Sequence, residues 1–195
     1  VYQGAATPVT TLMSTAVKAA SFLAFLRIFT SANFFRLEDL DFLNVMQWLA
    51  ILTMTVGNVA ALKQTNLKRM LAYSSIAHSG YMMVGIISAG FGENFDSGAT
   101  GLLFYIFAYS LMTVGTFALV ALFEKKETTV LSIDGLKGLS LKAPLVALSF
   151  AILLLSLAGI PPTLGFFSKF YLFSAAMDQG FIWLSLWGVI NSVIS

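Results

Sequence analysis

The sequence predicts an all-α protein that crosses a membrane several times, and three features support this fold class. The 195 residues are 58% apolar and only 10% charged, whereas a soluble domain carries about 25% charged residues. The apolar residues form continuous runs that are too long for barrel strands, and helices satisfy their own backbone hydrogen bonds in lipid. A hydrocarbon core about 30 Å thick takes about 20 residues per helix, so the chain has room for five or six spans.

We expect residues 1–195 to form one transmembrane region, in which Pro8 opens the first helix because proline suits the first helical position. The expected spans cover residues 8–28, 43–62, 70–90, 98–123, 144–176 and 181–195. Pro161 and Pro162 should break the fifth span, because they remove helix donors and clash with the preceding turn. The chain opens without a signal peptide and stops inside an apolar run, so we expect both ends to be cuts through a longer protein.

Several kinds of functional site are absent from the sequence. The chain has no cysteine, which excludes disulfides, thiolate metal sites and cysteine-bound iron–sulfur clusters in this segment. It shows no phosphate-binding glycine loop, metal-ligand spacing or nucleophile motif, so we expect no cofactor or metal site within it. Four glycines inside the spans are interpreted as helix-packing positions: Gly57, Gly80, Gly85 and Gly115. The net charge of +2 does not indicate nucleic-acid binding, since the basic residues lie in short loops.

The loop charges predict the orientation of the chain. When loops are assigned to alternate sides, one side collects most of the basic residues: Lys63, Lys68, Arg69, Lys125, Lys126, Lys137 and Lys142. The other side is mostly acidic, with Arg27 near its edge: Arg36, Glu38, Asp39, Asp41, Glu93, Asp96 and Asp178. By the positive-inside rule the lysine-rich side is cytoplasmic, and the protein is expected to be a multi-pass protein of a bacterial inner membrane.

Lys18 is a basic residue that lies inside a predicted span. It stands about ten residues into the first span, on the order of 15 Å deep at 1.5 Å per residue. A charged lysine at a helix centre costs roughly 2.5 to 3.5 kcal/mol on insertion scales, so it should face a polar interior and have a function. The alternative is a lysine that is neutral or paired only for helix packing.

Lys169 is the second lysine away from the loops, and it follows the double-proline break. Broken helices expose backbone groups that are tolerated only inside protein or facing water, and transporters place ion sites there. Burial lowers the pKa of a lysine and a nearby carboxylate raises it, so a lysine with a movable partner can load and release a proton. The alternative is that Lys169 reaches a membrane interface.

His78 is the only histidine, and it lies within the third predicted span. Ser74, His78 and Tyr81 are spaced as i, i+4 and i+7, which places them on one helix face. Such a polar stripe can hold water, and histidine can pass protons near neutral pH. A lone histidine is also common as a purely structural residue, so both interpretations stay open.

Three segments resemble a known family. Residues 64–76, with His78, Gly80 and Tyr81, resemble the signature of the antiporter-like subunits of respiratory complex I and of Mrp-type sodium/proton antiporters. Residues 1–5 with 8–10, and residues 156–166 leading to 169–171, are similar to the subunit N branch of that family, called subunit 2 in mitochondria. The resemblance covers nearly the whole chain.

This resemblance implies a fold and a function. The family has fourteen helices in which two inverted five-helix repeats each contain a broken helix, and this chain would hold helices eight to twelve and part of thirteen. Lys18, His78 and Lys169 would match the family's lysine on helix eight, histidine on helix ten and lysine on the second broken helix. The family's glutamate on helix five and its lysine on the first broken helix would lie upstream.

The resemblance also implies partners and cofactors. Such subunits carry no redox centre, and NAD and quinone are used elsewhere in the assembled complex. The expected function is a proton-translocating membrane-arm subunit of NADH:quinone oxidoreductase, with other membrane-arm subunits, the lipid bilayer and protons as its partners. The alternatives are an Mrp-type antiporter subunit, a membrane subunit of a hydrogenase complex and a passive scaffold. Neighbouring genes would distinguish the complex I, Mrp and hydrogenase functions.

Overall fold

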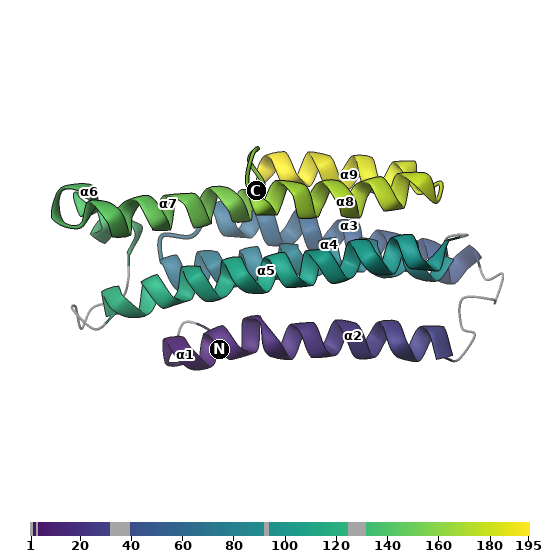
Figure 1. The fold of residues 1–195 in the computed structure, drawn as a ribbon, viewed down its shortest axis with the longest axis horizontal. Coiled ribbons are helices and arrows are strands. Elements are labelled where there is room, and N and C mark those ends of the chain that lie inside the picture. The colour runs from purple at the N-terminus through teal and green to yellow at the C-terminus, as the bar shows by residue number, and fades with distance from the viewer. Residues whose placement is uncertain (1, 3, 32–39, 92–93, 125–131) are drawn as a thin grey trace.

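The computed structural model describes residues 2, 4–31, 40–91, 94–124 and 132–195, which form an elongated bundle of helices (Figure 1). The helices are α1 (Thr7–Ser14), α2 (Ala16–Ser31), α3 (Leu40–Leu62), α4 (Leu67–Phe91), α5 (Phe95–Glu124), α6 (Leu139–Lys142), α7 (Pro144–Ala158), α8 (Leu164–Asp178) and α9 (Ile182–Ile194), with a 3-10 turn, η2, at Ile133–Leu136. Within these described ranges, β-type pairing is limited to an isolated bridge between Asn66 and Ser132. The all-α fold class is therefore confirmed.

Several of the helices are long and apolar enough to cross a membrane. Among the described residues, four stretches meet that condition: Thr7–Ile28, Asp41–Leu62, Leu67–Phe91 and Phe95–Phe123. Helices α7 and α9 are apolar but shorter. Figure 1 shows α7 and α8 following each other along one line, with the helix interrupted between them.

Asparagine caps set where two of the long helices begin. The Asn66 side chain accepts a hydrogen bond from the Arg69 backbone N–H at 3.1 Å, and the Asn94 side chain accepts one from Ser97 at 3.2 Å. Such side chains satisfy N–H groups that the first turn leaves without partners. Helix α4 therefore starts three residues before the expected Met70, and Lys68 is buried in its first turn instead of lying in a loop.

The first predicted span is interrupted, which the sequence interpretation did not expect. Helix α1 ends at Ser14 and α2 begins at Ala16. The Thr11 hydroxyl donates to the Thr7 carbonyl at 2.8 Å, and the Thr15 hydroxyl donates to the Thr11 carbonyl at 2.7 Å. Hydroxyls that bond to the preceding turn in this way compete with the backbone ladder and bend helices, which accounts for the break.

Helix α4 forms the centre of the bundle and packs against α3, α5 and α8. Small residues allow this close approach. A Cβ atom at Gly57 would lie 2.5 Å from the Ala77 backbone nitrogen, and one at Gly80 would lie 2.5 Å from the Met54 side chain. Cβ atoms at Gly85 and Gly115 would likewise lie 2.8 and 3.1 Å from neighbouring side chains. The interpretation of these glycines as packing positions is confirmed.

The two ends of the bundle differ in charge. One end, here called the lysine end, carries Lys63, Lys68, Lys137 and Lys142. At this end the Lys68 amine donates a hydrogen bond to the Ala5 carbonyl. The backbone bridge between Asn66 and Ser132 joins the start of α4 to the residue before η2. At the opposite end, the Gln179 side chain accepts a hydrogen bond from the Asn94 backbone N–H and donates one to the Asn94 carbonyl. Asp41, Asp96 and Asp178 are exposed there. Several charges assigned from the sequence lie outside the described residues: Arg36, Glu38, Asp39, Glu93, Lys125 and Lys126.

The contact between α4 and α5 gives a matched test of the packing. A Cβ atom at Gly98 would lie 2.3 Å from the Ala89 backbone nitrogen, whereas one at Gly101 would have no neighbour closer than 3.5 Å. We expect Gly98→Ala to destabilise the folded protein by about 1 to 3 kcal/mol, because backbone atoms cannot move aside as a side chain can. Gly101→Ala should be neutral or slightly stabilising, because alanine favours helix. Thermal unfolding of both full-length variants in detergent tests this, and equal stabilities would contradict it.

Candidate functional site

Lys169 is a residue of α8, and its side chain reaches back to the interruption between α7 and α8. Its side chain is only 3% exposed. The amine donates hydrogen bonds to the Ala158 carbonyl at 2.8 Å and to the Ser192 hydroxyl of α9 at 3.0 Å. Ala158 is the last residue of α7, and the carbonyl end of a helix carries a partial negative charge that favours a cation. The helix break thus supplies the acceptor for this buried amine.

Glycines on both sides of the break allow this arrangement. Gly159 has φ of 87°, a left-handed conformation that glycine adopts without strain, and a Cβ there would lie 3.0 Å from the Lys169 side chain. On the α8 side, a Cβ at Gly165 would lie 1.7 Å from the Ser156 carbonyl oxygen. The Gly165 N–H donates to the Ser156 hydroxyl at 3.1 Å, which fixes the start of α8 against α7.

Lys18 reaches the bundle from α2 and binds a residue of α4. Its amine donates to the Ser75 carbonyl and to the Ser75 hydroxyl, the latter at 2.6 Å. The Tyr109 hydroxyl donates to the same Ser75 oxygen at 3.2 Å, and the Lys18 amine lies 5.4 Å from the centre of the Tyr109 ring. Lys18 therefore contacts polar groups of α4 and α5.

His78 lies in the centre of an aromatic cluster, which consists of His78, Tyr81, Tyr105 and Tyr109. Its side chain is only 1% exposed, and its Nδ1 is hydrogen-bonded to the Tyr105 hydroxyl at 2.6 Å. The imidazole centre is 4.7 Å from that of Tyr109 and 5.8 Å from that of Tyr81. The cluster therefore joins α4 to α5 through groups that can exchange protons.

Tyr81 connects this cluster to Lys169. The Lys169 amine lies 4.8 Å from the centre of the Tyr81 ring, which is a cation–π distance. The Tyr81 hydroxyl accepts a hydrogen bond from the Asn58 side chain at 3.2 Å, and Asn58 also donates to the Asn191 carbonyl at 2.8 Å. A continuous series of contacts thus runs from Lys18 through Ser75 and the aromatic cluster, of which Tyr81 is the last member, to Lys169.

The groups around both amines are neutral in the part of the chain that the structure describes. Their hydrogen-bond partners are serine hydroxyls and backbone carbonyls, and the salt bridge resolved there joins Lys137 to Asp134 on the surface. The described residues also contain no group of three His, Cys, Asp or Glu side chains that could hold a metal ion. The arrangement suits proton transfer, since amines, imidazole and hydroxyls can each accept and donate a proton.

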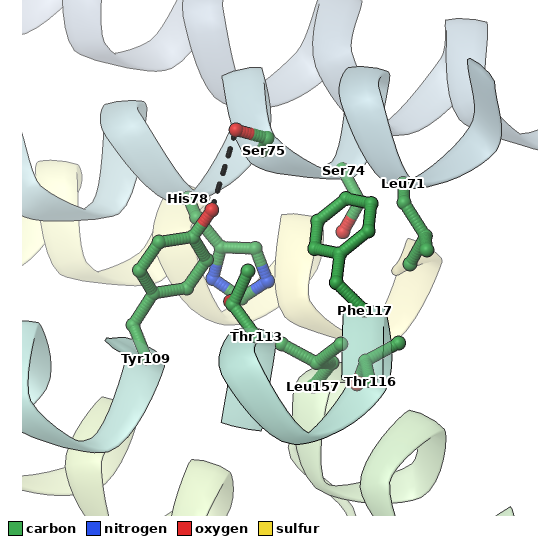
Figure 2. A pocket seen from close by; sticks show the side chains of 9 residues that line it. All are labelled: Leu71, Ser74, Ser75, His78, Tyr109, Thr113, Thr116, Phe117 and Leu157. Atoms are coloured by element: carbon green, nitrogen blue, oxygen red, sulfur yellow. Dashed lines mark hydrogen bonds between the residues drawn. The ribbon is translucent and has the colours of Figure 1, made fainter. Parts of the chain in front are cut away.

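Two cavities adjoin the series. The small cavity, of about 10 Å³, is shown in Figure 2 and is lined by Leu71, Ser74, Ser75, His78, Tyr109, Thr113, Thr116, Phe117 and Leu157. The large cavity, of about 260 Å³, shares Leu71, Ser74 and Leu157 with it. The remaining residues of the large cavity are Asn58, Ala61, Leu62, Gln64, Met70, Ile133, Leu154, Ala158 and Ser195.

The structure brings the three residues singled out from the sequence into one series, but it adds members that were not predicted. Ser75, not Ser74, binds Lys18, while Ser74 lines the cavities. The sequence does contain a pattern that indicates the site residues of α5. Four polar residues are spaced at intervals of four, four and three, so they share one helix face: Tyr105, Tyr109, Thr113 and Thr116. No such polar spacing in the sequence singled out Asn58.

Comparisons with known proteins show the family of the chain. A family model described as NADH:quinone oxidoreductase/Mrp antiporter, TM, matches residues 1–195. Two relatives named NADH-quinone oxidoreductase subunit N, from Bdellovibrio bacteriovorus and Trichlorobacter lovleyi, are 54% and 48% identical over the whole chain. The chain spans only 40% and 39% of the length of these relatives.

Solved structures show the same fold. A chain of respiratory complex I from Thermus thermophilus with bound aureothin matches with a TM-score of 0.79 and 36% identity, over 100% of this chain and 40% of that one. A chain of the Mrp complex from Dietzia sp. matches with a TM-score of 0.84 and 28% identity, over 99% of this chain and 34% of that one. The resemblance noted in the sequence is confirmed, and the chain belongs to the family of NADH:quinone oxidoreductase and Mrp antiporter membrane proteins.

Proposed function

We propose that the full-length protein is a proton-translocating membrane subunit of an NADH:quinone oxidoreductase complex, and that Lys18, His78 and Lys169 carry protons through this part of it. The observation that supports this most strongly is the continuous series of contacts between two lysines within an apolar bundle. Ionisable residues inside a membrane are costly and mark ion or proton routes. The names of the relatives, NADH-quinone oxidoreductase subunit N, are the reason that we propose this type of complex.

Lys18 and Lys169 act as sites that take up a proton and later release it. A charged amine held only by neutral acceptors is costly in an apolar interior, whereas a neutral amine offers a lone pair to an incoming proton. Lys169 has the Ala158 carbonyl at the end of α7 to stabilise its charged form, and Lys18 has both oxygens of Ser75. A change in the surroundings of either amine therefore changes whether its protonated, charged form or its neutral form is favoured.

His78 and the tyrosines link the two sites. His78 can receive a proton on one ring nitrogen and release one from the other, because a neutral imidazole has one acceptor nitrogen and one donor nitrogen. Its Nδ1 is bonded to Tyr105, and its ring contacts Tyr109, which shares Ser75 with Lys18. On the other side, Tyr81 leads to Lys169. Small rotations of these side chains, with water, would complete the transfer.

The names of the relatives support a proposal for the wider setting of the bundle. Other membrane subunits of the complex and the lipid bilayer would surround the bundle, whose apolar side chains are exposed along α3, α7 and α9. NAD and quinone would be used by other parts of the complex. The membrane is a bacterial inner membrane, and the lysine end faces the cytoplasm by the positive-inside rule.

An Mrp-type antiporter subunit is the second candidate. The structural match to the Dietzia Mrp chain favours it, because its TM-score is the higher of the two. The identity to relatives named subunit N is larger, at 54% against 28%, which favours the complex I function. Flanking genes for complex I subunits or for Mrp subunits would separate the two candidates.

Replacement of Lys169 tests the central role of the buried amine. Lys169→Ala removes the proton site, and Lys169→Arg keeps a charge that does not titrate, because the pKa of a guanidinium exceeds about 12. We expect both variants to lose proton uptake linked to quinone reduction in vesicles that contain the full-length subunit in its assembled complex. Assembly is measured separately.

A surface lysine supplies the control for this experiment. Lys137 is 81% exposed, so Lys137→Ala and Lys137→Arg should leave proton uptake unchanged. Normal coupled activity in Lys169→Arg would contradict a titrating role and leave a fixed-charge role. Normal activity in Lys169→Ala would contradict both roles.

The exposed acidic residues at the opposite end should matter little. Asp96 is exposed in the first turn of α5, and charges in water are screened over about 8 Å at physiological salt. We expect Asp96→Asn to keep turnover close to that of the natural protein. We expect the same for Glu93→Gln, although Glu93 lies outside the described residues. If either change abolished proton uptake while the complex assembled normally, a route confined to the interior would be wrong.

A further inference from the structure

Asn58 is a buried polar residue of α3 that bonds to two other helices near Lys169. Its side chain is only 2% exposed. The amide nitrogen, Nδ2, donates one hydrogen bond to the Tyr81 hydroxyl of α4 at 3.2 Å and another to the Asn191 carbonyl of α9 at 2.8 Å. A carbonyl can only accept, so the nitrogen of the amide must face α9, and both of its N–H groups are used. The side chain therefore has one defined orientation.

The backbones of α3 and α4 place Asn58 at the level of its partner on α4. A Cβ atom at Gly57 would lie 2.5 Å from the Ala77 backbone nitrogen, so the two helices touch there with no side chain between them. Tyr81 follows Ala77 by four residues and lies on the same face of α4. Long side chains lean towards the N-terminus of their helix, so the Tyr81 hydroxyl reaches back to the level of Asn58. The hydrogen bond between them is thus supported by a close backbone contact.

Both groups that accept from Asn58 lead directly to the Lys169 amine. The centre of the Tyr81 ring lies 4.8 Å from this amine. Ser192 follows the α9 carbonyl that Asn58 binds, and its hydroxyl accepts a hydrogen bond from the amine at 3.0 Å. The Ala158 carbonyl, which also accepts from the amine, belongs to α7. One side chain on α3 therefore holds two groups that contact the amine from two different helices.

The uncharged amide of Asn58 suits this position. A carboxylate in its place would favour the charged form of a nearby amine, and an ionised carboxylate has no N–H group to donate to the Tyr81 hydroxyl or to the α9 carbonyl. The ring face attracts a protonated amine, and a hydroxyl can accept from a charged amine or donate to a neutral one. The amide thus fixes the geometry without fixing the protonation state of Lys169.

We propose that Asn58 is a positioning residue for proton transfer at Lys169, because it holds the Tyr81 ring and the Ser192 turn of α9 against the amine at the same time. It acts through these two groups and does not carry the proton itself. The positioning part of the proposal stands on the hydrogen bonds. The part that concerns proton transfer rests on the proposed function.

A structure of the assembled complex that carries Asn58→Leu tests the positioning directly. Leucine has the branched shape of asparagine and no hydrogen-bonding atoms in its side chain. We expect the Tyr81 ring centre to lie more than about 6 Å from the Lys169 amine, or the distance from the amine to the Ser192 hydroxyl to exceed about 3.5 Å. If both groups kept their natural distances from the amine, the positioning role would be overturned.

Proton uptake by vesicles that contain the assembled complex tests the functional part. We expect Asn58→Leu to slow uptake roughly five- to tenfold at an unchanged amount of complex, the effect of losing about one hydrogen bond. Tyr81→Phe keeps the ring and removes the hydroxyl that Asn58 binds. It should therefore slow uptake in the natural protein but cause no further loss in Asn58→Leu. If Tyr81→Phe caused the same loss in both backgrounds, the hydroxyl would act independently of Asn58 and the proposal would be overturned.

A second residue of α3 supplies the control. The Thr53 hydroxyl donates to the Leu49 carbonyl of the same helix at 2.6 Å, so Thr53→Val should leave uptake unchanged. If Asn58→Leu did not assemble, Asn58→Asp would replace it. Aspartate has the shape of asparagine and lacks its N–H donors, so we expect a similar loss of uptake, and normal uptake would overturn the role of Asn58.

The results separate this inference from the proposed function. Normal uptake in Asn58→Leu together with loss in Lys169→Ala would overturn only the role of Asn58. Normal uptake in both variants would overturn the proposed function as well.

Discussion

The hydrogen bond from the Lys169 amine to the Ala158 carbonyl is the interaction on which the rest of the site depends. An uninterrupted helix would use that carbonyl for its own backbone ladder, so the acceptor exists only because α7 stops at Ala158. The left-handed Gly159 and the prolines that follow enforce this stop. The position of Lys169 and the interruption of the helix are thus one structural feature.

Neutral partners give the interior its chemical character. A lysine beside a fixed carboxylate would stay charged, because an opposite charge nearby favours the charged form. The described partners of Lys18 and Lys169 are hydroxyls, carbonyls and aromatic rings, which bind an amine in either protonation state. Under the proposed function, a proton held at either end of the series would need no large rearrangement of the helices.

The sequence was sufficient for the fold class and for the residues that stand out chemically. Lysines and a histidine within apolar runs are conspicuous, and a double proline marks a helix break from composition alone. The sequence could not supply partners from other helices, such as Ser75 for Lys18, because serine is common in membrane helices and its role depends on what packs against it. The interruption at Thr15 was missed for a related reason, since threonine hydroxyls bond to the preceding turn without a distinctive pattern.

Helix α9 contacts the site at two successive residues. Ser192 accepts a hydrogen bond from Lys169, and the Asn191 carbonyl accepts one from Asn58, which in turn holds the Tyr81 hydroxyl. A slide or rotation of α9 would therefore change the surroundings of the amine and of the ring above it in a single movement. The outer face of this helix is apolar and exposed at Val189 and Val193, so whatever packs on that face is separated from Lys169 by the thickness of a single helix.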